Sequence, residues 1–363
     1  MIGARGGSLP KSVPLLVVRR GGAVESVHRG SVAVVAADGR LLAATGDPEE
    51  PVFLRSSAKP VQLVPFLAGG GEKRFALSTE EIALAAASHG GEPFHTRAAA
   101  AMLARGGFTA ADLHCGAHPP MHEETARALA FRREEPGPLH SNCSGKHAAM
   151  LLACRLFGED PATYWWPEHP LQKRILSALA LLAGVPVARI GIAVDGCSVP
   201  VFRIPLANLA LLYARLKGAR VPGEAPRAFR ARVRIAEAMT SAPEMVAGTG
   251  RFTTNLMRAF GGDLLAKEGA EGVYAVGVSP ALARSLSATL SVGIALKIED
   301  GAERGRDAVT VEVLRQLGLV TGARLIALRR LARRPVKNVR GDVVGDMRTV
   351  FRLDRFASRE RAE

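Results

Sequence analysis

β-rich segments near both ends of the chain, separated by a long helical middle, constrain the fold most. Apolar and β-branched runs lie at 15–19, 31–36, 41–44, 190–194, 273–278 and 290–298. Gly21-Gly22 and Asp38-Gly39 interrupt the first three runs. An Asp-Gly pair between apolar runs is a strong hairpin signal. We expect the strands from the two ends to pair in one sheet.

Helical patterns occupy the stretch from Ala58 to about Leu265. The expected helices lie at 79–88, 95–103, 146–157 and 171–182, followed by one at 306–317. The tail from Ser358 is polar and is expected to fray. These patterns predict an α+β fold in which terminal strands form a sheet with flanking helices and the middle forms a mostly helical lobe. We expect residues 1–363 to form one unit, with a sheet lobe at 10–57 and 268–357 and a helical lobe at 58–267.

Size and hydrophobicity place the chain among ordinary globular proteins. It has 363 residues, of which 48% are hydrophobic and 23% are charged. Its apolar runs are too short or too interrupted to span a bilayer. The segment Met1–Arg5 lacks the apolar stretch of a signal peptide. We therefore expect a cytoplasmic protein that does not bind a membrane.

A formal net charge of +14 raises the question of a nucleic-acid partner. The excess is almost entirely arginine, with 39 Arg and nine Lys, and mild clusters occur at 227–234 and 329–340. Aromatic residues make up only 5% of the chain, so stacking platforms for single strands are scarce. No basic stripe alternates with aromatic residues. We expect no nucleic-acid partner.

A serine with a lysine three residues later is the first candidate for catalysis. Ser56 and Lys59 lie in Arg55-Ser-Ser-Ala-Lys-Pro60. A serine hydroxyl needs a base before it attacks a carbonyl, and residues three apart share one face of a helix. We expect Ser56 at the positive end of a helix that runs to about Leu67. The alternative makes Ser56 or Ser57 a helix cap and Lys59 a solvated charge.

A second serine, Ser88, lies in Ala87-Ser-His-Gly-Gly91. Two glycines after a polar Ser-His pair suit a backbone that approaches a ligand closely. The alternative is a helix C-terminus with a glycine cap.

Cysteines suggest a metal site. Cys143 and Lys146 are three residues apart, and Cys197 follows a β-like run. Two thiolates and one nitrogen donor suit zinc and leave a fourth position for water or substrate. Spacing alone favours His147 over Lys146 as the nitrogen ligand, because a lysine ligand must first lose its proton. A site without metal remains an alternative, and Cys115 and Cys154 are expected to be buried as small apolar residues.

Taken together, five motifs resemble the asparaginase II family, the class 3 or rhizobial-type L-asparaginases. The motifs are Arg55-Ser-Ser-Ala-Lys-Pro60, Ala87-Ser-His-Gly-Gly91, His140-Ser-Asn-Cys-Ser-Gly-Lys-His147, Asp195-Gly-Cys-Ser-Val-Pro200 and Gly248-Thr-Gly-Arg251. The match runs in order from about Leu15 to Gly318. The resemblance implies a fold like that of the serine β-lactamases and glutaminases. It also implies hydrolysis of L-asparagine to L-aspartate and ammonia, and a homodimer.

The same resemblance implies roles for individual residues. Ser56 pairs with Lys59, and Ser88 pairs with a lysine that matches Lys267. One accessory zinc ion per subunit is held by Cys143, Lys146 and Cys197, which replaces His147 by Lys146 as the nitrogen ligand. The remaining candidates are placed around the substrate: Arg55, His147, Asp195, Gly196 and Arg251.

Three other functions remain open. The chain could be another serine amidohydrolase, such as a glutaminase or a penicillin-recognising enzyme. It could use Thr249 or Thr253 as a nucleophile released by self-cleavage. It could also be a zinc- or nucleic-acid-binding regulator, for which steep salt dependence of DNA affinity would be the signature.

Overall fold

The main sheet combines strands from both ends of the chain, as the sequence predicts. The computed structural model describes residues 11–286, 289–333 and 335–356. The expectations for Met1–Arg5 and for the tail from Ser358 concern residues outside these ranges. Within them, the sheet follows the order β10-β11-β1-β2-β9-β8-β7, with β3 paired to β2 and β12 paired to β3. Its strands are β1 (Val13–Arg20), β2 (Ala23–Ala36), β3 (Leu41–Thr45), β7 (Leu264–Glu268), β8 (Val273–Val278), β9 (Val292–Ile298), β10 (Val336–Lys337), β11 (Val343–Thr349) and β12 (Asp354–Arg355).

The centre of this sheet is covered on both faces. β2 pairs with β9 in antiparallel register, with Val32 opposite Leu296. Four successive residues of β2, 32–35, are buried, which indicates packing above and below the strand. Helix α9 (Leu206–Leu216) packs against β2, β8 and β9. Helix α14 (Glu303–Gln316), followed by α15 (Gly322–Ala332), contacts β1 and β9.

Two glycines allow α9 to lie directly on the sheet. A Cβ at Gly293 would lie only 1.7 Å from the Ala210 carbonyl oxygen, and a Cβ at Gly277 would lie 2.6 Å from the Tyr213 carbonyl oxygen. The opposite face of β9 contacts α14, because Ile298 lies 3.5 Å from the Cβ position of Gly305. Alternation along a strand places residues 293 and 298 on opposite faces. The sheet is therefore enclosed between α9 and α14.

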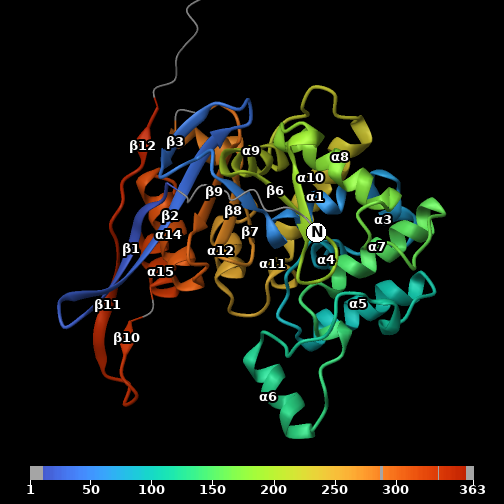
Figure 1. The fold of residues 1–363 in the computed structure, drawn as a ribbon, viewed down its shortest axis with the longest axis horizontal. Helices are drawn as coiled ribbons and strands as arrows, with labels where there is room; N and C mark the ends of the chain where they lie inside the picture. The colour runs from blue at the N-terminus through green and yellow to red at the C-terminus, as the bar shows by residue number, and fades with distance from the viewer. Residues whose placement is uncertain (1–10, 287–288, 334, 357–363) are drawn as a thin grey trace, which may run out of the picture.

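Most helices from the middle of the chain lie on the right of Figure 1, and the last of them lies against β7. Besides α9, these helices are α1 (Lys59–Gln62), α2 (Val64–Ala68), α3 (Gly71–Arg74), α4 (Thr79–Ala85), α5 (Pro93–Arg105), α6 (Glu123–Arg132), α7 (Ser144–Phe157), α8 (Pro170–Ala183), α10 (Pro226–Ser241), α11 (Pro243–Val246) and α12 (Phe252–Phe260). A small sheet in the order β4-β6-β5 joins Pro51–Phe53, Pro200–Pro205 and Gly191–Val194. A short helix, α13 (Pro280–Ala283), follows β8.

The expectation of one continuous helix from Ser56 to about Leu67 is wrong. A 3-10 turn, η1 (Arg55–Ala58), comes first, and the short helices α1 and α2 follow it. Pro60 lies in the first turn of α1 and Pro65 in the first turn of α2. A proline lacks the N–H that an uninterrupted helix needs in its interior. The prolines therefore divide the segment, and Ser56 and Lys59 lie on a tight turn.

The α+β prediction itself is confirmed. Main-sheet strands end at Thr45 and resume at Leu264, and most of the intervening residues are helical. The predicted lobe boundaries at 57/58 and 267/268 stay a prediction. None of the described helices is both long enough and apolar enough to cross a membrane. The cytoplasmic location also stays a prediction.

Candidate active site

Lys59 and Ser88 are joined directly where three helical segments meet. The Lys59 ammonium donates to Ser88 Oγ at 2.9 Å, to the Asn142 carbonyl at 3.1 Å and to the Ala87 carbonyl. Lys59 begins α1, Ser88 follows α4 and Asn142 precedes α7. An ammonium has three N–H donors, and this geometry uses all three. Lys59 therefore ties together the segments that carry the predicted motifs.

Adjacent serines in η1 have different environments. Ser57 is fully buried, and its hydroxyl donates to the Leu54 carbonyl at 2.6 Å. Ser56 is half-buried, and among the described residues no group forms a hydrogen bond with its Oγ. Neither serine caps a helix. Lys59 is only 1% exposed, so the alternative of a capping serine beside a solvated lysine is wrong.

Lys267 is the second lysine of this centre. It lies on β7, is fully buried and donates to the Glu268 carbonyl at 2.9 Å. Burial lowers the pKa of Lys267 well below its ordinary value, and the charge of Lys59 lowers it further. A lysine must be neutral to act as a base, and burial of this kind favours the neutral amine. Lys267 is therefore suited to accept a proton.

His89 fixes the turn that carries Ser88. Its Nδ1 accepts a hydrogen bond from the Gly91 N–H at 3.1 Å, and its Nε2 donates to Ser144 Oγ at 2.9 Å. Burial and the neighbouring His95 lower the pKa of His89 well below its ordinary value. Gly91 has a φ of +74°, a backbone conformation that favours glycine. The Ser-His-Gly-Gly sequence thus forms a rigid turn and does not simply cap a helix.

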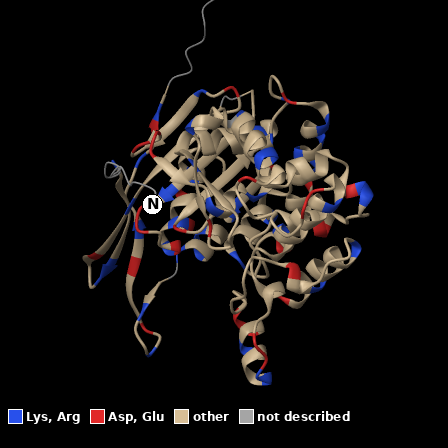
Figure 2. Cartoon of the chain, turned by 45° about the vertical axis from the view of Figure 1, so that its right-hand side comes forward, with Lys and Arg blue, Asp and Glu red and all other residues tan. Residues whose placement is uncertain are grey.

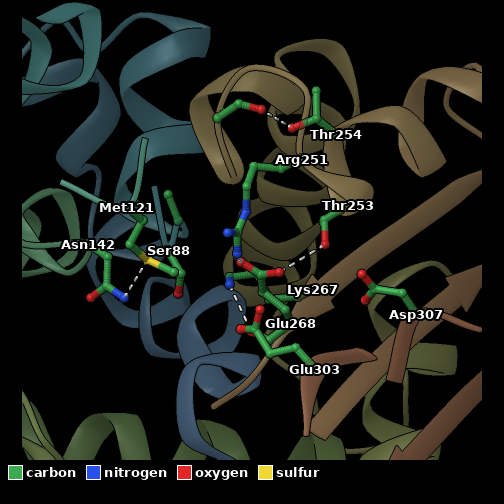
Figure 3. Close-up of polar contacts among 12 residues, drawn as sticks. Ser88, Met121, Asn142, Arg251, Thr253, Thr254, Lys267, Glu268, Glu303 and Asp307 are labelled. Carbon is green, nitrogen blue, oxygen red and sulfur yellow. Dashed lines mark hydrogen bonds and ion pairs between the residues drawn. The ribbon is translucent and has the colours of Figure 1, made fainter. Parts of the chain in front are cut away.

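A charged network borders Lys267 on the sheet side. Figure 3 shows Ser88, Met121 and Asn142 on one side of the view and Arg251, Lys267 and Glu268 on the other. Arg251 binds Glu268 at 2.9 Å, and Arg306 binds the same carboxylate at 3.3 Å. Burial raises the pKa of Glu268, but Arg306 and Arg251 outweigh burial and lower it to about 2. Glu268 is therefore ionised and shared between two guanidinium groups.

Arg55 connects η1 to the loop after β5. Its Nε donates to Asp195 Oδ1 at 2.8 Å, and the N–H of Gly196 donates to the same oxygen at 2.9 Å. Burial raises the pKa of Asp195, but Lys146 and Arg55 outweigh burial and lower the net value. Arg55 has a φ of +49°, which is strained for a residue with a side chain. Strain of this kind clusters at functional sites and persists where surrounding contacts enforce it.

Cys143, Lys146 and Cys197 meet beside Asp195. Lys146 Nζ lies 2.9 Å from Cys197 Sγ, and all three side chains are buried. A hydrogen bond between the two cysteines lowers the pKa of Cys143 well below its ordinary value and raises that of Cys197. Burial lowers the pKa of Lys146, but the two sulfurs outweigh burial and raise the net value. The cluster thus places a lysine whose cationic form is favoured beside two buried sulfurs.

The donor set of this cluster fits zinc. Sulfur and nitrogen are the ligands that zinc prefers, and a bound metal would displace the protons from Lys146 and Cys197. His147 lies outside the cluster. It is fully buried and its Nδ1 accepts a hydrogen bond from the Tyr164 hydroxyl at 2.6 Å. Its Nε2 has no hydrogen-bond partner among the described residues.

A second group of potential metal ligands, Cys154, Glu159 and His169, is a poorer candidate. Their donor atoms lie within 4.8 Å of one another. Burial raises the pKa of Cys154 to about 12, which keeps the thiol protonated. His169 Nδ1 accepts from the Leu171 N–H, and its Nε2 contacts the Asp160 carbonyl. Because both ring nitrogens already have partners, we retain Cys154 as a core residue.

The residues that converge here match a known family. The model of the L-asparaginase II family matches residues 16–349. The chain belongs to the L-asparaginase II family. No curated protein sequence matches this L-asparaginase II family member.

Solved structures also match this family member over most of its length. A structure described as Mglu in its native form covers 81% of this chain at 15% identity, with a TM-score of 0.41. A probable glutaminase of Bacillus subtilis covers 80% at 13% identity, with a TM-score of 0.36. The matches take in 66% of that Mglu chain and 87% of the glutaminase chain. The chain thus spans just under two thirds of the length of Mglu.

Residues without a predicted role complete the centre of this L-asparaginase II family member. Asn142 offers its carbonyl to Lys59, and its side-chain oxygen lies 3.1 Å from Cys143 Sγ. Glu268 directly follows Lys267 on β7, and its partner Arg306 comes from α14. Asn142 lies inside a recognised motif and Glu268 adjoins a candidate lysine, but only the packing of the lobes assigns them partners.

Proposed function

We propose that this protein is an L-asparaginase that hydrolyses the side-chain amide of L-asparagine through a serine acyl-enzyme. Two features together support this proposal. Lys59 forms a hydrogen bond with Ser88, and burial lowers the pKa of Lys267. One lysine makes three donor contacts, and the other is held in an environment that favours the neutral amine. Two titratable groups held in different electrostatic environments are typical of acid–base pairs in enzymes.

Ser56 is the proposed nucleophile. Its Oγ attacks the amide carbonyl carbon, and its proton passes to the Lys59–Ser88–Lys267 group. The carbon–nitrogen bond then breaks, the leaving nitrogen takes up a proton from that group, and ammonia departs. Water hydrolyses the resulting β-aspartyl ester by the reverse proton path and releases L-aspartate. The absence of a hydrogen-bond partner for Ser56 Oγ among the described residues supports this assignment.

Arg251 is the stronger of the two candidates for the substrate α-carboxylate. Arg55 binds Asp195 at 2.8 Å and also reaches Glu271 at 3.9 Å. Arg251, by contrast, has Glu268 as its one carboxylate partner among the described residues, and Glu268 is itself shared with Arg306. The guanidinium of Arg251 therefore keeps more donor capacity for an additional carboxylate in a charge-assisted pair. Asp195, Gly196 and His147 remain proposed contributors to the substrate pocket.

We also propose an accessory zinc ion held by Cys143, Lys146 and Cys197. Bound zinc would polarise nearby oxygen ligands as a Lewis acid. The two sulfurs and one nitrogen supply suitable donors, and Asp195 Oδ2 lies 4.0 Å from Cys197 Sγ. The chain's own residues carry out the proposed acyl transfer. Removal of zinc with a chelator should lower both thermal stability and affinity for asparagine, and no change in either would remove zinc from the proposal.

The decisive experiment compares Ser56→Ala with its neighbour Ser57→Ala. Ammonia release from asparagine should fall by about 10³-fold or more in Ser56→Ala, because a nucleophile is removed. Ser57→Ala should keep activity and lose about 1 kcal/mol of stability with its hydrogen bond to Leu54. Retained activity in Ser56→Ala would exclude it as the nucleophile.

Substrate preference and the mass of the denatured chain distinguish the alternative enzymes. Parallel assays with asparagine, glutamine and nitrocefin distinguish an asparaginase from a glutaminase or a penicillin-recognising hydrolase. A denaturing gel with fragments instead of one full-length band would favour self-cleavage at Thr249 or Thr253. Thr253 is fully buried and bonded to the Tyr274 hydroxyl at 2.9 Å, which argues against a free nucleophile at that position.

Partner predictions have separate tests. We propose a homodimer, for which light scattering should give twice the 38.3 kDa mass of one chain. Lys and Arg are scattered among Asp and Glu over the cartoon in Figure 2. This mixture supports the proposal that nucleic acid is not a partner. Steep salt-dependent DNA binding without amide hydrolysis would favour the regulator instead.

A further inference from the structure

The arginine cluster at 227–234 lines a surface hollow that the proposed amidase chemistry does not use. The hollow measures about 390 Å³ and lies between α10 and the end of α2. Pockets of this order hold small ligands in proteins. Its lining residues are Leu67, Ala68, Gly69, Gly70, Glu72, Arg227, Arg230, Ala231 and Arg234.

Three guanidinium groups border this hollow. Arg227, Arg230 and Arg234 are spaced three and four residues apart on α10, which places them on one face of the helix. Arg234 is fixed in place, since it binds Glu72 at 2.8 Å and Thr79 Oγ1 at 2.9 Å. Glu72 is the only carboxylate among the described lining residues. The hollow therefore has a surplus of positive charge.

Arg227 and Arg230 supply that surplus. Both are exposed, and within the described ranges neither forms an ion pair or a side-chain hydrogen bond. An apolar floor of Leu67, Ala68 and Ala231 lies beneath them. Gly70 has a φ of +92°, and no atom lies within 4 Å of the position where its Cβ would be. The glycine turn thus keeps one side of the hollow open.

We propose that this hollow binds a small anion that carries two linked phosphate groups. Guanidinium groups bind phosphate oxygens in a bidentate manner, and neighbours at i and i+3 have Cβ atoms about 5 to 6 Å apart. Such spacing suits two adjacent phosphates better than one carboxylate. The apolar floor fits an organic group attached to the diphosphate. The inference is independent of the proposed asparaginase activity, because none of these residues belongs to the candidate active site.

A second, larger hollow has fewer arginines among its lining residues. It measures about 560 Å³, and its charged lining residues are Glu49, Arg189 and Arg203. Arg203 donates to the Pro51 carbonyl and lies over the Phe53 ring. One of its two arginines is thus engaged, and the other, Arg189, is balanced by Glu49, whereas two exposed arginines are left over in the α10 hollow. The α10 hollow is therefore the better anion site.

Calorimetry with inorganic pyrophosphate tests the proposal on the full-length protein. Wild type should bind one pyrophosphate per chain in a saturable manner, and Arg227→Gln/Arg230→Gln should weaken the affinity at least tenfold. The matched control is Arg97→Gln/Arg352→Gln, which removes one exposed arginine from α5 and one from the loop between β11 and β12, and should change affinity less than twofold. Circular dichroism spectra verify that both double variants are folded.

Three results would overturn the proposal. The first is no saturable heat for wild type at pyrophosphate concentrations up to about 1 mM. The second is an equal loss in both double variants, which would indicate attraction by net charge alone. The third is equal affinity for succinate at matched ionic strength, which would make the site a general carboxylate site.

Discussion

Lys267 and Lys146 are both buried lysines, yet their surroundings favour opposite charge states. Lys267 is fully buried on β7, and burial together with Lys59 lowers its pKa. Lys146 is 3% exposed on α7, and the sulfurs of Cys197 and Cys143 raise its pKa despite burial. Burial penalises the charged form in both places. The neighbouring group decides whether that penalty is offset.

The surroundings of Lys267 therefore suit proton transfer, whereas those of Lys146 suit a bound metal or a retained positive charge. Lys267 is already prepared to accept a proton, because the folded protein disfavours its ammonium form. Lys146 must exchange its proton for a metal before it can act as a ligand. The same residue type thus serves two different purposes about one candidate site. Substitution of each lysine by the uncharged methionine distinguishes them.

The largest expected effect is on catalysis by Lys267→Met. Loss of a proton-transfer group should lower the kcat for ammonia release by about 10²- to 10⁴-fold. Thermal stability at neutral pH should be unchanged or higher, because the variant removes a buried group that resists protonation. Kinetics on asparagine and a melting curve measure both effects. Wild-type kcat would show that Lys267 has no part in proton transfer.

Lys146→Met should have the opposite effect on stability. Removal of the ammonium deletes its contact with Cys197 Sγ and the positive charge beside both sulfurs, and loss of one partner of a buried ion pair costs about 3 to 5 kcal/mol. Chemical denaturation measures this loss, and zinc titration should show weaker binding. Control substitution of the exposed Lys73 by methionine should change stability little. Equal stability of Lys146→Met and wild type would mean that the cluster is neutral.

The pH dependence of unfolding sharpens the comparison further. The pKa of Lys267 is lower in the folded protein than in the unfolded chain, where it is about 10.4. Between these two pKa values the unfolded state binds more protons, so stability rises with pH by up to about 1.4 kcal/mol per unit. Lys267→Met should remove this slope. Denaturation of both proteins from neutral pH up to about pH 10, near the pKa of the unfolded chain, measures the difference.

The smallest expected effect is that of Arg55→Lys. Lysine keeps the positive charge but loses the planar guanidinium that holds Asp195 beside the sulfur cluster. We expect about a tenfold rise in KM for asparagine and a smaller change in kcat, as for loss of a positioning contact. Steady-state kinetics measure the two constants. A larger fall in kcat than rise in KM would instead place Arg55 in the chemical step.

Motifs in the sequence identified most of the groups that converge at the candidate site. Ser56, Lys59 and Ser88 carry recognisable spacing, and Cys143, Lys146 and Cys197 carry a soft-ligand pattern. Spacing alone favours His147 over Lys146, because it does not register that the two neighbours project from different sides of a helix. The structure directs Lys146 to Cys197 and His147 to Tyr164.

Local sequence patterns predicted the backbone and the side-chain contacts less well where prolines and distant segments determine them. The expected helix after Ser56 is divided at Pro60 and Pro65, so the Ser-x-x-Lys spacing does not follow a regular helix. The hydrogen bond of Lys59 reaches Ser88, 29 residues away. Helical periodicity reports neighbours along one element, whereas this contact depends on how α1 and α4 are packed.

By itself, the sequence determined the α+β class, the terminal origin of the main sheet and the identity of the reactive groups. Alternating apolar residues, turn glycines and motif order contain that information locally. Only the tertiary structure decided which lysine is driven toward neutrality and which is held as a cation. The physical reason is that a charge in a buried site depends on desolvation and on partners from distant elements: Glu268 and Lys59 around Lys267, and Cys197 beside Lys146.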